Sequence, residues 1–253
     1  MAHRASSSVP RDKDLIRDRI WTLLEEQNIA RFPRPVFHRI PNFLGAEEAG
    51  RKVAGLKEFE DAKTIKVNPD SAQRQVRFEA LSRGKLLLMP TPRLRSGFIL
   101  LDDAVPKARH RVASTIHGAF VLGKKVPLDK LPAIDLAVVG SVAVAPDGGR
   151  IGKGEGYSEI EYGILRELGS VSESTPIVTT VHDSQIIDFV PLEDHDIAVD
   201  YIVTPTRMLV VNRKRPRPGG IIWSKVTPGM IERMPILREL SERRATSQNS
   251  VQV

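Results

Sequence analysis

The chain contains no cysteine among its 253 residues, and aromatic residues make up only 5% of it. Disulfide bonds, thiol nucleophiles and cysteine-ligated metal clusters are therefore excluded, and we expect a cytoplasmic protein. The scarcity of aromatics leaves few side chains on which single-stranded bases could stack. The longest uncharged apolar run, residues 136–146, is too short to cross a bilayer, so we expect no membrane partner.

The composition is otherwise that of a globular protein, with 41% hydrophobic and 27% charged residues. Residues 1–11 lack the apolar core of a secretory signal, and we expect them to be disordered. Residues 12–243 are expected to form a single α/β domain, and residues 244–253 a disordered tail.

Basic residues outnumber acidic ones, giving a formal net charge of +7. Part of this excess lies at residues 212–218, where prolines alternate with lysine and arginine and favour an extended, solvated segment. The charge keeps nucleic acid open as an alternative partner.

Helical and strand patterns alternate along the chain. Helices are predicted at residues 13–27, 45–56, 71–82, 160–168 and 228–242. Strands are predicted at residues 64–67, 85–90, 134–145, 176–181, 200–204 and 208–211. This alternation favours a three-layer, Rossmann-like α/β fold whose mostly parallel sheet carries helices on both faces.

Residues 148–159 form a glycine-rich turn between a buried strand and a helix start. In such a turn the backbone can approach a phosphate closely, and the helix N-terminus favours negative charge. Arg150 and Lys153 add two cations to it. The spacing of Gly152, Gly154 and Gly156 is neither the dinucleotide-binding G-x-G-x-x-G nor a P-loop. A flexible surface turn is the alternative interpretation.

Other catalytic or metal-binding patterns are weak. No G-x-S-x-G nucleophile elbow exists, since residues 139–143 lack the second glycine. His182, His195 and the neighbouring aspartates alternate along extended segments, so they would not all face one transition-metal ion.

The turn resembles the signature of the 5-formyltetrahydrofolate cyclo-ligase family, roughly G-x-R-x-G-x-G-x-G-Y-Y-D. The matching residues here are Gly148 or Gly149, Arg150, Gly152, Gly154, Gly156 and Tyr157. Weaker matches occur in the family's order over residues 12–211: Lys13 and Arg17, Gly84 and Lys85, Pro90, Gln185, Pro191, Glu193, His195, Asp196 and Thr204.

The resemblance implies ATP and Mg²⁺ as cofactors and a folate as substrate. It places ATP against Lys13, Arg17, Gly149, Arg150, Gly152, Lys153, Gly154, Glu155, Gly156 and Tyr157. It places the substrate against Asp70, Gln73 and Tyr157, and the metal at Glu159. The sequence departs from the family at four of its positions, which are occupied by Asp70, Gln73, Ser158 and Glu159.

The insertion at residues 32–45 and the segment 215–240 resemble a divergent subgroup, the methenyltetrahydrofolate synthetase domain-containing proteins. The implied reaction is ATP-dependent cyclisation of 5-formyltetrahydrofolate to 5,10-methenyltetrahydrofolate through a phosphorylated formyl group. The alternative is a non-catalytic nucleotide- or RNA-binding protein on the same fold.

Overall fold

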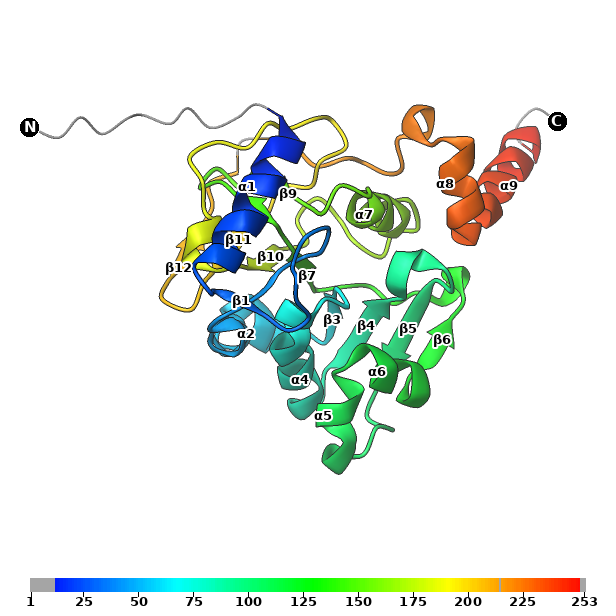
Figure 1. Cartoon of the computed structure of the whole chain (residues 1–253). Coiled ribbons are helices and arrows are strands. Elements are labelled where there is room, and N and C mark those ends of the chain that lie inside the picture. Colours follow the sequence, from blue (N-terminus) through cyan, green and yellow to red (C-terminus); the bar gives the residue numbers. More distant parts are fainter. Residues whose placement is uncertain (1–11, 214, 251–253) are drawn as a thin grey trace, which may run out of the picture.

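The computed structural model of the protein describes residues 12–213 and 215–250 (Figure 1). Its centre is an eight-stranded sheet in the order β12-β11-β10-β7-β3-β4-β5-β6. The strands from β11 to β4 are parallel, while the pairings β11–β12, β4–β5 and β5–β6 at the two edges are antiparallel. The strands are β3 (Thr64–Val67), β4 (Leu86–Pro90), β5 (Phe98–Leu101), β6 (Lys124–Val126), β7 (Leu136–Gly140), β10 (Ile177–Thr180), β11 (Tyr201–Val203) and β12 (Met208–Val210).

Apolar side chains cover both faces of this sheet. In β7, Val138 joins the core beneath α1 (Lys13–Glu26), α2 (Ala46–Ala54) and α4 (Arg74–Ser82). Its neighbours Ala137 and Val139 join the opposite core, beneath α7 (Tyr157–Glu167) and α9 (Pro235–Ser250). Because successive strand residues point to opposite faces, the continuous apolar strands predicted from the sequence feed both cores. The predicted three-layer fold is confirmed.

The strand predicted at residues 134–145 is wrong in its second half. The parallel strand ends at Gly140, and β8 (Ala143–Val144) leaves the sheet to pair with β9 (Arg150–Ile151) in a small antiparallel ribbon. The amide of Gln185 donates to the carbonyl oxygens of Ser141 and Val142, at 3.0 and 3.1 Å. These bonds replace the ones that a continuing strand would make.

Several elements were not predicted. Between β4 and β7 the chain forms the antiparallel strands β5 and β6 and two short helices, α5 (His110–Ala113) and α6 (Ile116–Leu122). The remaining short elements are β1 (Ala30–Arg31), β2 (Asn42–Phe43) and α3 (Lys57–Asp61).

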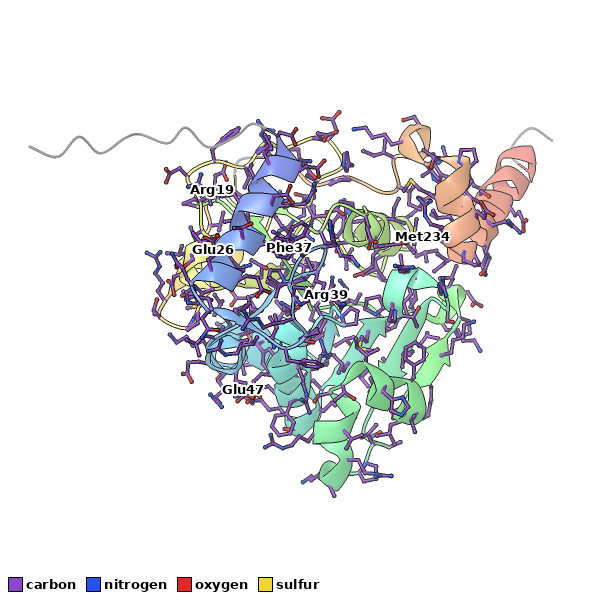
Figure 2. All side chains as sticks on the ribbon, in the orientation of Figure 1. Arg19, Glu26, Phe37, Arg39, Glu47 and Met234 are labelled. Carbon is purple, nitrogen blue, oxygen red and sulfur yellow. The ribbon has the colours of Figure 1, made fainter. Side chains whose placement is uncertain are left out.

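The C-terminal helix predicted at 228–242 is two helices, α8 (Pro228–Arg233) and α9. Pro235 begins the second, as expected of a residue without a backbone N–H. Met234 lies buried at the junction, where Figure 2 labels it. The backbone of α9 continues to Ser250, so residues 244–250 of the expected disordered tail are helical. Residues 1–11 and 251–253 lie outside the described residues.

The basic segment at 212–218 is not simply solvated. Arg217 is buried and donates to the carbonyl oxygens of Ala198 and Thr175, and it also pairs with Asp200. Arg213 pairs with Glu173 at 2.6 Å. These two arginines therefore hold the segment against the fold rather than offering free charge to a polyanion. Within the described residues, no helix combines the length and apolar character required to cross a membrane.

Candidate functional site

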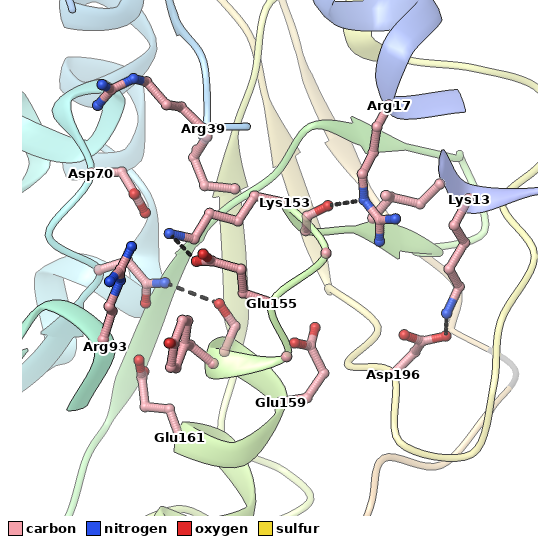
Figure 3. A pocket seen from close by; sticks show the side chains of 18 of the residues that line it. Lys13, Arg17, Arg39, Asp70, Arg93, Lys153, Glu155, Glu159, Glu161 and Asp196 are labelled. Atoms are coloured by element: carbon pink, nitrogen blue, oxygen red, sulfur yellow. Dashed lines mark hydrogen bonds and ion pairs between the residues drawn. The ribbon is translucent and has the colours of Figure 1, made fainter. Parts of the chain in front are cut away.

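A cavity of about 860 Å³ opens at the carboxyl edge of the parallel strands (Figure 3). One wall is residues 68–70 and 90–94, which end or follow β3 and β4. The opposite wall is the start of α1 together with residues 191–196, and the glycine loop 152–156 lies between the two. A crevice at this edge is where open α/β sheets bind ligands.

The glycine loop leads directly into α7. Gly154 and Gly156 have φ angles of +97° and +71°, a region that favours glycine. Gly156 is the N-cap of α7 and has no side chain to accept a hydrogen bond from the first-turn amides. Since residues 156–159 line the cavity, the positive end of this helix faces it, a favourable arrangement for an anion.

Two of the loop's glycines lie against arginine side chains. A Cβ atom added to Gly152 would lie 2.9 Å from Nη2 of Arg150. One added to Gly154 would lie 3.2 Å from Cζ of Arg17. The loop thus passes between the buried guanidinium of Arg150 and that of Arg17, which lines the cavity. Side chains at Gly152 and Gly154 would crowd these two groups.

The two basic residues predicted on the first helix line the cavity. Nζ of Lys13 lies 2.6 Å from Oδ2 of Asp196, and Nε of Arg17 donates to the carbonyl oxygen of Gly152 at 2.8 Å. Arg17 also pairs with Asp14. These contacts tie α1 to the glycine loop and to the 191–196 segment. Within the loop, Nζ of Lys153 lies 2.6 Å from Glu155 and 5.7 Å from the centre of the Tyr157 ring.

Arg150 does not have the exposed position that the sequence suggested. It lies in β9 with 1% of its side chain exposed, donating to the carbonyl oxygen of Gly140 at 3.0 Å and to Oε1 of Glu159 at 2.7 Å. Its Nη2 is buried without a hydrogen-bond partner. Gly149 and Arg150 therefore lie behind the cavity wall, whereas the other predicted nucleotide residues line it.

Glu159, the predicted metal ligand, lines the cavity in the first turn of α7. Burial alone would raise the pKa of this carboxyl, but the Arg150 guanidinium outweighs burial and holds the pKa below its usual value. Among the described residues, no group of three or more histidine, aspartate and glutamate side chains is placed to hold a metal ion. A metal ion at Glu159 would therefore need further ligands from a bound substrate or from water.

Of the two residues predicted to contact the substrate through the β3 wall, only Asp70 lines the cavity. Burial raises its pKa above the usual value, and Lys153 and Arg77 partly offset this effect. Gln73 lies behind it, fully buried, with its amide donating to Oγ1 of Thr180 at 2.8 Å. The carbonyl oxygen of this Gln73 side chain has no partner.

Sequence reasoning missed two cavity residues, Arg39 and Arg93. Arg39 belongs to the inserted coil, where Figure 2 labels it near Phe37, and Arg93 follows β4. Figure 3 shows them on either side of Asp70. Both side chains are exposed and form no ion pair with another described residue. The position of Arg93 just past a parallel strand is a signal that could have identified it.

Comparison with known proteins agrees with this geometry. The model of the "5-formyltetrahydrofolate cyclo-ligase family" matches residues 9–205. A methenyltetrahydrofolate synthase domain-containing protein of Bos taurus is 49% identical over 233 residues, which are 90% of this chain and 61% of that protein. The chain thus spans about three-fifths of this relative's length.

A more distant relative is a 5-formyltetrahydrofolate cyclo-ligase of Mycolicibacterium smegmatis, 26% identical over 137 residues, covering 53% of this chain and 66% of that protein. A solved structure, the Aquifex aeolicus 5,10-methenyltetrahydrofolate synthetase, aligns over 80% of this chain and 94% of its own, with a TM-score of 0.50 and 20% identity. That likeness supports the fold. Because the family model matches most of its length, the chain belongs to the 5-formyltetrahydrofolate cyclo-ligase family.

Proposed function

We propose that the protein is an ATP-dependent ligase that cyclises 5-formyltetrahydrofolate to 5,10-methenyltetrahydrofolate, with ADP and phosphate as the other products. The observation that carries the proposal is the uncapped start of α7, which faces a cavity between a cationic wall and Asp70 in a chain of this family. We also propose a cytoplasmic location, which the absence of cysteine supports.

In this proposal the phosphates of ATP lie over residues 152–157. The amides of the first turn of α7 and the loop backbone would donate to phosphate oxygens. Lys13, Arg17 and Lys153 would neutralise charge, since each already lines the cavity. Gly149 and Arg150 would act from beneath, because Arg150 supports the loop at Gly152. Glu155 would hold Lys153 through their ion pair.

Glu159 fits the way in which proteins hold Mg²⁺, which is by one or two carboxylates together with substrate phosphates. Its lowered pKa keeps the carboxyl ionised, and Arg150 donates to its Oε1. Mg²⁺ bound there would neutralise charge on the phosphates. The residues then left to act on the phosphates directly are the cations already described.

The folate would lie against the opposite wall. The Asp70 carboxylate can accept hydrogen bonds from the N–H groups of a pterin. Gln73 would brace this wall from behind, and the Tyr157 ring, half-buried at the start of α7, would lie beside the substrate. Arg39 and Arg93, on either side of Asp70, would bind the carboxylates of the folate's glutamate.

The chemistry then requires little from the protein beyond placement. The formyl oxygen attacks the γ-phosphorus of ATP and ADP leaves. N10 of the folate attacks the activated carbon and loses its proton, and departure of phosphate leaves the methenyl bridge. Such a phosphoryl transfer is accelerated mainly by positioning and by neutralising charge, which the glycine loop and its cations can provide.

Turnover tests the proposal. The protein would be mixed with 5-formyltetrahydrofolate, ATP and Mg²⁺, and the methenyl product followed by its absorbance. We expect product in the wild type and a large loss in the Asp70→Ala and Glu159→Ala variants. No product from the folded wild type at saturating substrates would reject the ligase. ATP binding without turnover would instead support the non-catalytic binding protein.

A further inference from the structure

A second chamber of about 390 Å³ lies on the other side of the glycine loop. It shares Gly154, Glu155, Gly156, Glu159 and His195 with the main cavity, so the two adjoin at these residues. Its far wall is formed by residues of the segment 218–233. That segment lies outside residues 9–205, the part matched by the family model, so this wall is an addition to the matched region.

The chamber is more apolar than the phosphate region beside it. Ile160 of α7 and Ile221 are each 9% exposed and face it together with Ile222 and Met230. Lys225 lines the chamber and bridges to the shared rim, where its Nζ lies 3.1 Å from Nδ1 of His195. An apolar chamber with a cation near its entrance suits a flat, uncharged ring system attached to a charged group.

The order of the groups along the site decides which ligand part fits. Asp70 lines the main cavity alone, whereas Gly154, Gly156, Glu159 and His195 line both the main cavity and the chamber. Along the site, Asp70 therefore comes first, then the glycine loop, then Glu159 with His195, and the chamber lies beyond them. A pterin at Asp70 and a γ-phosphate over the loop would leave the rest of the nucleotide to extend toward the chamber.

We propose that this chamber binds the base and ribose of the nucleotide, with the segment 218–233 as the wall that selects the base. The inference rests on the proposed ATP-dependent function. The purine ring lies between the isoleucines and Met230, whose flexible thioether adapts to a planar ring. Lys225 lies at the ribose and α-phosphate, the charged side of the nucleoside.

The folate's aminobenzoyl-glutamate tail is the competing occupant. The tail begins at the pterin, on the Asp70 side of the glycine loop, and would have to cross the phosphates to reach the chamber. Arg39 and Arg93 offer the tail's carboxylates unpaired cations on the near side. The observations therefore favour the nucleoside.

Filling the chamber tests the assignment. Met230→Trp occupies it without changing charge, and Met208→Trp is the matched control, since Met208 is 46% exposed on the edge strand β12. Calorimetry would measure ATP, inorganic tripolyphosphate and 5-formyltetrahydrofolate binding to the full chain. We expect Met230→Trp to weaken ATP about tenfold or more, with tripolyphosphate and the folate unchanged and the control like wild type.

Unchanged ATP affinity in a folded Met230→Trp protein would overturn the inference, as would a loss confined to the folate. The unaltered protein gives a second test that does not depend on the variant folding. Photolysis with 8-azido-ATP should label a peptide within residues 218–233, and labelling only elsewhere would overturn the assignment. If the chamber assignment is wrong, the wild-type protein still forms the methenyl product. If the ligase proposal is wrong, no methenyl product forms.

Discussion

Arg150 of β9 donates to Oε1 of Glu159 in α7 at 2.7 Å, joining the two ends of the glycine loop. Only 1% of the arginine side chain and 14% of the glutamate side chain are exposed. The pair therefore fixes the distance between the strand that enters the loop and the helix that leaves it. This contact, together with the bond from Arg17 to Gly152, sets the shape of the proposed phosphate site.

Replacing Arg150 should lower the free energy of unfolding. Arg150→Met leaves Glu159 as an unpaired, largely buried carboxylate, and breaking such a pair typically costs about 3 kcal/mol of unfolding free energy. Urea denaturation of wild type and variant would measure the loss. Arg207→Met is the control, because Arg207 is 55% exposed and pairs with Asp183 at 3.1 Å. A surface pair contributes under about 1 kcal/mol, so equal losses would contradict a special role for Arg150.

The same pair predicts a pH dependence. Arg150 holds the pKa of Glu159 below its usual 4.5, with His195 contributing less. A lowered pKa stabilises the fold fully above the unfolded value and loses this effect as the pH falls through the folded value. The stability gap between wild type and Arg150→Met should therefore be widest above pH 4.5 and shrink below it. Urea midpoints measured across this range would show it, and a gap that widened on acidification would refute it.

A side chain at Gly152 should disturb the glycine loop and the Arg150 guanidinium beneath it. The Cβ atom of Gly152→Ala would lie 2.9 Å from Nη2 of Arg150, so either the loop moves or this guanidinium shifts and its bonds to Gly140 and Glu159 weaken. Because a small displacement of a binding loop misplaces its contacts with the ligand, we expect ATP affinity to fall about tenfold or more. Gly55→Ala is the control, since Gly55 lies at the end of α2 with a φ of −90° and its added Cβ would lie 3.5 Å from its nearest neighbour, an ordinary contact. Calorimetric titration with ATP would compare them, and matching affinities would remove Gly152 from the site.

The sheet could be predicted because its central strands carry a simple signal. β4 is a short apolar run, and β3 and β10 are rich in the β-branched residues that favour strands, so each can be recognised without its neighbours. β6 was missed since its two lysines are exposed and only Val126 is buried. Its place in the sheet depends on pairing with β5, which is tertiary information.

The site could be predicted in part for a similar reason. The spacing of Gly152, Gly154 and Gly156 is local and identifies the loop. The burial of Arg150 is not local, because it depends on Gly140 and Glu159 approaching from other elements. Likewise, Arg39 reaches the cavity only because the inserted coil is folded beside the β3 and β4 wall. A local sequence pattern cannot predict such contacts between distant segments of the chain.

Arg39 and Arg93 should bind the substrate and not the nucleotide. They line the cavity beside Asp70, and their side chains form no ion pair within the described part of the chain. The backbone of Arg93 has φ of +58°, an uncommon conformation for this residue type that is often retained at functional sites. A charge-assisted hydrogen bond is worth about 1.5–3 kcal/mol, so each alanine variant should raise the KM for 5-formyltetrahydrofolate about tenfold or more.

The KM for ATP should stay unchanged in both variants, because Lys13, Arg17 and Lys153 remain on the proposed phosphate side of the cavity. Arg95→Ala provides the control, since Arg95 is exposed two residues after Arg93 but lines a different hollow. Steady-state kinetics with each substrate varied in turn would separate the two effects. A rise in the KM for ATP in Arg39→Ala or Arg93→Ala, with the folate KM unaltered, would place these arginines on the nucleotide and reverse the proposed orientation of the two substrates.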